Sequence, residues 1–147
     1  MIGNGSPAPP VADVERHGPT ALVFYKSTCA VTEMAGPPLA RFGEAYPGVV
    51  TGVGQDPQAT LDAFAEELGW TFPQVTDLAP YVASDAYGIR SAPTVVVIDA
   101  DGTVVDGMES WDREAMNRVS ATLAGLLGVE PVTLSTADDG LPEFKPG

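Results

Sequence analysis

Cys29 is the only cysteine of the chain and the residue best suited to nucleophilic chemistry. A single cysteine excludes an internal disulfide, and one histidine, His17, is too little beside it to complete a Cys/His zinc site. We interpret His17 as a surface residue, and we expect neither a metal nor a cofactor. Two interpretations of Cys29 stay open: a reactive thiol, and an inert buried thiol of the kind common in protein cores.

Cys29 follows a segment with the pattern of a buried strand. Thr20–Tyr25 (TALVFY) is a nearly continuous apolar run, as in a strand covered on both faces of a parallel sheet. Ser27 and Thr28 are residue types that cap helices, so a helix is predicted from Cys29 to about Tyr46.

The first turn of that helix sets the chemistry expected of the thiol. The sulfur of Cys29 would lie over unpaired backbone N–H groups, whose partial positive charge favours the nucleophilic thiolate. Thr32 follows three residues later, so its hydroxyl is expected to face the sulfur and donate a hydrogen bond. Lys26 adds a favourable field, whereas Glu33 opposes it because a nearby carboxylate disfavours the thiolate.

The rest of the pattern alternates strands and helices and then changes to a hairpin. Pro37–Pro38 are expected to kink or break the first helix. The later elements expected, in chain order, are a strand (Val49–Val53), a helix opened by Pro57, an extended piece (Gln74–Thr76), a short helix (Pro80–Tyr87), a strand (Thr94–Asp99), a turn (Asp101–Gly102), a strand (Thr103–Met108) and a helix (Trp111–Leu127). This order predicts an α/β fold with a central mixed β-sheet flanked by helices on both faces.

One domain is expected, over residues 19–128. Residues 1–18 are predicted to be an irregular lead-in with a short strand near Val11–Val14. Residues 129–147 hold three prolines and little periodicity. This C-terminal tail is expected to be irregular, or to be an edge segment laid on the domain.

The formal net charge of −13 limits the partners. Proteins bind nucleic acid through Lys and Arg side chains that neutralise phosphates, and binding to an anionic membrane surface also needs basic side chains. We therefore expect neither partner. No apolar run is long enough to span a bilayer, and Met1–Pro10 lacks the pattern of a signal peptide, so a cytoplasmic location is expected.

Three segments carry a resemblance to a known family. They are the strand running into the cysteine (LVFYKSTCAVTEM), Pro37 at its spacing from Cys29, and YGIRSAPTVVVIDADG. From Leu22 to Leu127 the chain resembles the thioredoxin superfamily, in particular its TlpA-like and AhpC/TSA (peroxiredoxin-like) branch. The resemblance implies a thioredoxin-like fold.

The resemblance also implies roles for particular residues. It places Pro93 opposite Cys29 as a cis-proline, and it assigns pairing with the substrate backbone to Ala92, although a trans proline that opens a strand stays an alternative. The expected catalytic set is Cys29, Thr32 and Pro93, and Ala92 and Thr28 are expected to contact substrate. The substrate groove could be lined by Tyr25, Trp70, Phe72 and Trp111, but core packing is the expected role of most of these aromatic residues.

Departures from the family pattern narrow the activity. TlpA-like reductases carry Cys-x-x-Cys, but here the stretch is Cys-Ala-Val-Thr, so Thr32 occupies the resolving position. Val23 stands where thioredoxins keep a buried acid. Peroxiredoxins precede their cysteine with a Pro and a Thr or Ser, and the matching residues here are Leu22 and Lys26.

A further peroxiredoxin residue is also replaced. Pro93 occupies the position of an arginine that polarises the peroxide in peroxiredoxins. Arg90 is close enough in sequence to substitute for that arginine, but we interpret it as a surface residue.

Three functions remain. The first is a monothiol oxidoreductase, in which Cys29 attacks a protein disulfide or a mixed disulfide of a low-molecular-weight thiol and an external thiol resolves the adduct. The second is a one-cysteine peroxidase, in which peroxide oxidises Cys29 to a sulfenic acid. The third is a non-catalytic domain that binds a partner through the old substrate groove. The sequence leaves the substrate, the reductant and the oligomeric state open.

Overall fold

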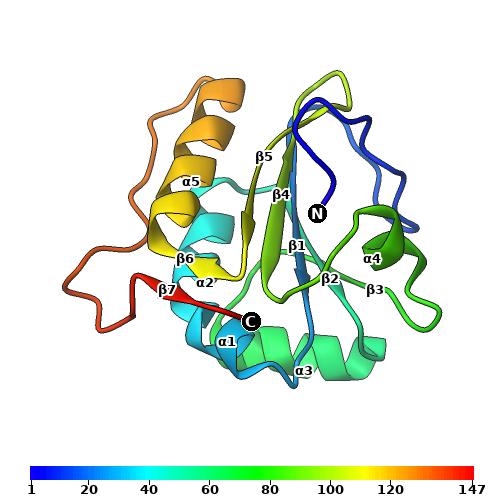
Figure 1. The fold of residues 1–147 in the computed structure, drawn as a ribbon, viewed down its shortest axis with the longest axis horizontal. Coiled ribbons are helices and arrows are strands. Elements are labelled where there is room, and N and C mark those ends of the chain that lie inside the picture. Colours follow the sequence, from blue (N-terminus) through cyan, green and yellow to red (C-terminus); the bar gives the residue numbers. More distant parts are fainter.

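A five-stranded mixed sheet forms the centre of the molecule (Figure 1). The computed structural model describes residues 1–147. The strands lie in the order β3-β2-β1-β4-β5, with β1, β2 and β3 parallel and β4 and β5 each antiparallel to its neighbour. Their bounds are Thr20–Tyr25 (β1), Val50–Gly54 (β2), Gln74–Thr76 (β3), Thr94–Ile98 (β4) and Val104–Glu109 (β5). The predicted central mixed sheet is confirmed.

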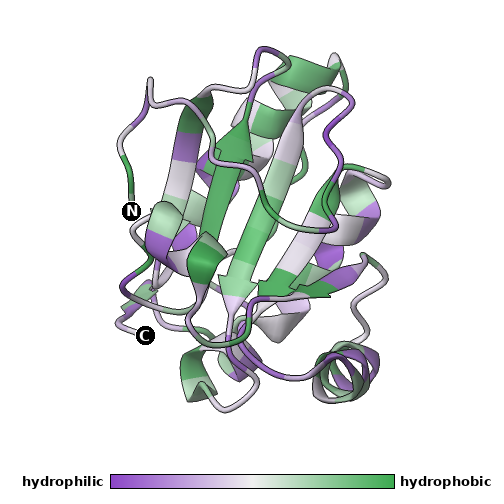
Figure 2. Ribbon diagram, turned by 90° about the vertical axis from the view of Figure 1, so that its right-hand side faces the viewer, coloured by the Kyte–Doolittle hydropathy of each residue, from purple (hydrophilic) through white to green (hydrophobic).

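Helices cover both faces of the sheet, as predicted, but unequally. Side chains of β1 alternate between the faces, so Ala21, Val23 and Tyr25 join the larger core and Leu22 and Phe24 join the smaller one. The larger core packs under four helices: α1 (Ala30–Met34), α2 (Gly36–Ala45), α3 (Gln58–Leu68) and α5 (Arg113–Leu127). The smaller core lies under α4 (Val82–Ala86) and the N-terminal segment, and the central strands between them are hydrophobic (Figure 2).

The predicted helix from Cys29 to Tyr46 is broken, as its prolines led us to expect. α1 ends at Met34 and α2 begins at Gly36, with Pro37 in its first turn. A proline has no N–H to donate there, and a helix start needs none. The helix also begins one residue later than predicted, because Cys29 has an extended backbone and serves as the N-cap residue.

Two expectations about other elements were wrong. No strand forms near Val11–Val14; Val11 packs against the smaller core, and the only bridge of this segment joins Pro7 to Thr103. The last helix begins at Arg113 rather than Trp111, because Asp112 caps it by accepting a hydrogen bond from the N–H of Ala115 at 3.1 Å.

The tail is irregular over residues 129–143, and its last residues form a short segment laid on the domain. A short strand, β7 (Phe144–Lys145), pairs antiparallel with β6 (Trp111–Asp112). Asp139 anchors the segment before β7, because its carboxylate accepts hydrogen bonds from the Ser135 hydroxyl and the Leu141 N–H. These bonds favour the ionised form and hold the pKa of the Asp139 carboxyl below its usual value. None of the helices has the length and apolar character needed to cross a membrane.

Candidate active site

The pairing of β1 with β4 brings the cysteine and the proline loop together. Phe24 lies opposite Thr94 in this antiparallel pair. The residues that follow β1 and those that precede β4 therefore leave the sheet at the same edge. Cys29 belongs to the first group, and Ala92 and Pro93, joined by a cis peptide bond, belong to the second.

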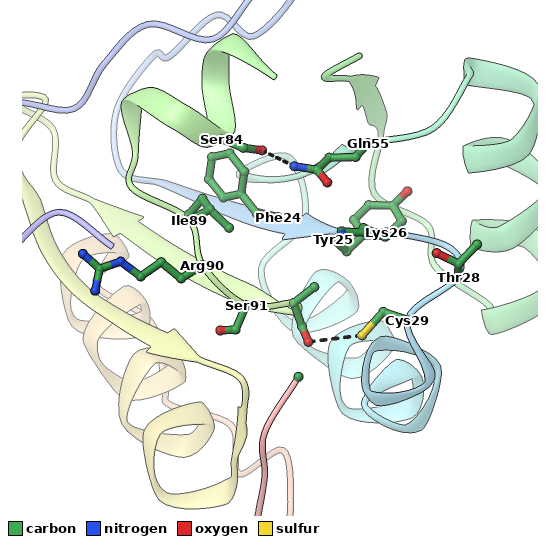
Figure 3. A pocket seen from close by; sticks show the side chains of 12 residues that line it. Phe24, Tyr25, Lys26, Thr28, Cys29, Gln55, Ser84, Ile89, Arg90 and Ser91 are labelled. Atoms are coloured by element: carbon green, nitrogen blue, oxygen red, sulfur yellow. Dashed lines mark hydrogen bonds between the residues drawn. The ribbon is translucent and has the colours of Figure 1, made fainter. Parts of the chain in front are cut away.

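The sulfur of Cys29 faces the proline loop directly. Its thiol donates a hydrogen bond to the carbonyl oxygen of Ala92, with Sγ and O separated by 3.4 Å (Figure 3). A carbonyl oxygen can accept only from the protonated thiol. The nucleophilic thiolate must therefore give up this bond when Cys29 attacks a substrate.

Both loops are held by their own hydrogen bonds. The N–H of Ser27 donates to Asp56 Oδ2 at 2.8 Å, and the N–H of Cys29 donates to the Lys26 carbonyl at 3.2 Å. On the other side, Thr94 Oγ1 donates to the Ser91 carbonyl at 2.8 Å. Each loop is thus held by hydrogen bonds that do not involve the other loop. The bond from the Cys29 thiol to Ala92 then joins the two loops.

A pocket of about 330 Å³ opens beside the half-buried sulfur. Its far side is polar, because Gln55 Nε2 donates to Ser84 Oγ at 3.1 Å and Ser84 Oγ donates to the buried Asp77 at 2.6 Å (Figure 3). The pocket is lined by Phe24, Tyr25, Lys26, Thr28, Cys29, Gln55, Ser84, Ile89, Arg90, Ser91, Ala92 and Gly147. No group of three or more His, Cys, Asp or Glu side chains is placed to hold a metal ion.

Thr32 does not make the hydrogen bond that the sequence predicted. Its side chain is fully buried, and its hydroxyl has no partner. Cys29 is the N-cap residue of α1 rather than part of the helix, with an extended backbone (ψ 115°). The sulfur turns toward Ala92 instead.

The other predicted residues divide between pocket and core. Ala92 and the exposed Thr28 line the pocket, whereas Pro93 is buried. Val23 is fully buried among apolar side chains of the larger core. Arg90 is exposed, as expected, and its guanidinium extends away from the sulfur in Figure 3.

Most of the predicted aromatic residues pack in the core, and Tyr25 also reaches the pocket. Its ring lies 5.1 Å from that of Trp70, centroid to centroid, and its hydroxyl donates to Gln74 Oε1 at 2.6 Å. Burial raises the pKa of this phenol, and the carboxylates of Asp56 and Asp62 add to the shift. Tyr25 therefore stays a neutral hydrogen-bond donor at physiological pH.

Six lining residues were not singled out from the sequence: Phe24, Ile89 and Ser91, which lie in the segments that carry the family resemblance, and Gln55, Ser84 and Gly147, which lie outside them. Gln55 follows β2 directly, and the carboxyl ends of parallel strands are the usual place for ligands, so this signal was present. Ser84 and Gly147 come from α4 and the tail, and nothing in their local sequence marks them.

The tail reaches the loop that ends in Pro93. The Pro142 carbonyl accepts from Trp111 Nε1 at 2.8 Å, and the N–H of Gly147 donates to Ser110 Oγ at 3.1 Å. In Figure 3 the red C-terminal segment ends below the Cys29–Ala92 hydrogen bond. A Cβ atom on Gly147 would overlap the carbonyl oxygen of Ala92, so only glycine fits there.

Several solved structures have a similar fold. The chain is similar to a putative thiol:disulfide interchange protein DsbE from Chlorobium tepidum, with a TM-score of 0.73 and 18% identity over 87% of this chain and 100% of that one. It is also similar to the thioredoxin domain of a thiol-disulfide oxidoreductase from Bacteroides vulgatus, with a TM-score of 0.68 and 18% identity over 84% and 99%. A putative protein disulfide isomerase from Bacteroides thetaiotaomicron has a TM-score of 0.70 and 20% identity over 87% and 92%.

These likenesses define the class of fold: the domain is thioredoxin-like, as the sequence predicted. The family model for AhpC/TSA matches residues 10–106, which is more than half of the chain. The chain therefore belongs to the AhpC/TSA family. No curated protein matches its sequence.

We expect Thr32→Val to raise the free energy of unfolding by about 1 kcal/mol or more, because it removes a buried hydroxyl that has no partner. Urea denaturation measures the change. Thr122→Val is the matched control and is expected to lower the free energy of unfolding, since Thr122 Oγ1 donates to Asp106 at 2.7 Å. A less stable Thr32→Val protein would show that the buried hydroxyl has a hydrogen-bond partner, and a slower reaction of its Cys29 would show that the hydroxyl serves the thiol.

Gly147→Ala should displace the tail from Ala92, since the added methyl group overlaps a backbone oxygen. We expect the alkylation of Cys29 by a bulky maleimide to become several-fold faster, and alkylation by the smaller iodoacetamide to change less. Gly125→Ala is the control, because its Cβ meets nothing within 4 Å. Equal rates for the bulky reagent in all three proteins would mean that the tail does not restrict access.

Proposed function

We propose that this protein is a monothiol oxidoreductase that exchanges disulfides through Cys29. The observation that carries the proposal is the half-buried sulfur held 3.4 Å from the carbonyl of Ala92, beside an open pocket and with no second thiol in the chain. The loop that ends in Pro93 lies directly beside the sulfur, and the pocket opens next to it. The thiol-disulfide proteins that share the fold support the same chemistry.

The proposed cycle has two exchanges. Cys29 loses its proton to solvent, and the thiolate attacks one sulfur of a disulfide R–S–S–R. A bond forms between Cys29 Sγ and that sulfur, the S–S bond breaks, and the other half leaves as a thiolate that takes up a proton. An external thiol then attacks the mixed disulfide, which restores the Cys29 thiolate and carries the R–S group away as a new disulfide.

Residue 32 explains why the second step needs an external thiol. A cysteine there would attack the mixed disulfide from within the chain, but Thr32 has no sulfur. Val23, fully buried among apolar side chains, leaves no carboxylate beneath the site to accept a proton for such a step. The two replacements are consistent with each other and with a cycle that ends on another molecule.

A peroxidase is less well supported. Polarising a peroxide next to the thiolate requires a cation or hydroxyl aimed at the sulfur, and the guanidinium of Arg90 extends away from it (Figure 3). The Thr32 hydroxyl is buried without a partner and does not bond to the sulfur. The third function, a non-catalytic binding domain, predicts no disulfide exchange at Cys29, so the reactivity of this thiol separates it from the proposal.

The cytoplasm is the location we propose. The second exchange consumes an external thiol, and the cytosol maintains such thiols in reduced form. Recovery of the protein from an oxidising compartment in cell fractionation would contradict this location.

The test of the function is adduct formation on Cys29. On exposure to a small disulfide such as hydroxyethyl disulfide, the wild-type protein should gain one half of the disulfide by intact mass spectrometry, and an added thiol should remove it. Cys29→Ser should gain nothing. Absence of an adduct, or an adduct that thiols cannot remove, would overturn the proposal, and a sulfenic acid formed rapidly with peroxide would favour the peroxidase.

Thr32→Cys is expected to convert the protein to a two-thiol exchanger. Position 32 is buried one turn from Cys29, so the new thiol should attack the mixed disulfide and form an internal disulfide, seen as the loss of two hydrogens by mass. Ala121→Cys, at an exposed position on α5, is the control and should leave the Cys29 adduct in place. Persistence of the adduct in Thr32→Cys would contradict the assignment of residue 32 as the resolving position.

A further inference from the structure

The charges around the pocket differ from those of the whole chain. The sequence holds 20 acidic and 7 basic residues, so a random lining would be acidic. The charged side chains that line the pocket are instead Lys26 and Arg90, both cations; no Asp or Glu side chain lines it, and Asp77, which bonds to the lining Ser84, is itself buried. They lie on the two loops that meet at the sulfur: Lys26 three residues before Cys29, and Arg90 two residues before Ala92.

The cations of this region are also unpaired. Elsewhere in the molecule the guanidinium groups of Arg16, Arg41, Arg113 and Arg118 each donate to a protein acceptor. Lys26 and Arg90 make no ion pair or hydrogen bond through their side chains, and the one other such cation, Lys145, lies in β7 two residues before the pocket-lining Gly147. Every cation without a protein partner is thus in or near the pocket.

The pocket has the size for a small molecule. Its volume of about 330 Å³ is at the lower end of the range for small-molecule sites. Gly147 stands against the carbonyl of Ala92, which blocks the side along which a polypeptide would run next to Pro93. The side chains of Gln55 and Ser84 add hydrogen-bonding groups on the far wall (Figure 3).

We infer that the pocket selects small disulfides that carry carboxylate groups, with Lys26 and Arg90 attracting the carboxylates while Cys29 attacks the disulfide. This inference rests on the proposed function and names its substrate class. The sulfur chemistry is the balanced exchange given above, with an anionic thiolate as leaving group and an external thiol as the second reactant. The guanidinium of Arg90 extends away from the sulfur (Figure 3), so a carboxylate drawn to it would leave the S–S bond free to lie near Cys29.

Local cations are needed because the molecule as a whole repels such a substrate. A net charge of −13 lowers the concentration of anions near the surface, and the two cations counter this only within their own neighbourhood. Both side chains are exposed, so each is expected to change the rate with an anionic disulfide by about two- to five-fold. Salt should weaken the preference, since exposed charges are screened.

The experiment compares three disulfides of similar size and different charge: dithiodipropionate (anionic), hydroxyethyl disulfide (neutral) and cystamine (cationic). Intact mass spectrometry at low ionic strength gives the rate of adduct formation on Cys29. Each rate is divided by the rate of a free small thiol with the same disulfide, which removes the intrinsic reactivity. We expect normalised rates in the order anionic, neutral, cationic, with the differences reduced at high salt.

Variants assign the preference to the pocket. Lys26→Gln and Arg90→Gln should each lower the ratio of the anionic to the neutral rate by about two- to five-fold. Ala121→Glu makes the same change in net charge at an exposed position on α5, outside the pocket, and should leave that ratio unchanged.

The outcomes separate the two proposals. An adduct with none of the three disulfides would overturn the proposed function and this inference with it. Adducts with all three at equal normalised rates would overturn the inference alone. The same holds for an anionic preference that Ala121→Glu lowers as much as Lys26→Gln and Arg90→Gln do, because net charge rather than the pocket would then account for it.

Discussion

The antiparallel pairing of β1 with β4 is the constraint on which the site depends. It sets Phe24 opposite Thr94, so the chain leaves one strand and enters the other at a single edge of the sheet. The loop with Cys29 and the loop with Ala92 and Pro93 therefore meet, although they are far apart in sequence. A change of register by one residue would exchange the faces of every β1 side chain and disrupt both cores, so burial on two sides fixes the position of the sulfur.

The buried residues Val23 and Thr32 carry no ionisable group, whereas the exposed lining of the pocket carries two cations. Val23 is packed among apolar side chains, and the hydroxyl of Thr32 is buried without a partner. Neither residue supplies a second thiol or a carboxylate that could accept a proton. The charged groups of the pocket are the exposed Lys26 and Arg90, and what the site can do then depends on Cys29 and on the molecules that these cations attract.

Much of the fold was predictable because its signals are local. Apolar runs gave the strands, and Pro37 gave the break between α1 and α2. The errors arose where contacts between residues far apart in the sequence determine the local structure. Val11 is apolar because it packs on the sheet, not because it belongs to a strand. The hydroxyl of Thr32 was predicted to bond to the sulfur, but the thiol bonds instead to Ala92, a residue 63 positions away in the sequence.

The sequence by itself determined the order of strands and helices, the single thiol, and the absence of a resolving cysteine at residue 32. These follow from residue identity and from periodicities a few residues long. Only the tertiary structure decided that the thiol bonds to Ala92, that Gln55 and Ser84 form the far wall of the pocket, and that Gly147 stands beside it. The physical reason is that these contacts join segments whose separation is set by sheet pairing and by the β6–β7 ribbon, and no local pattern records where such segments meet.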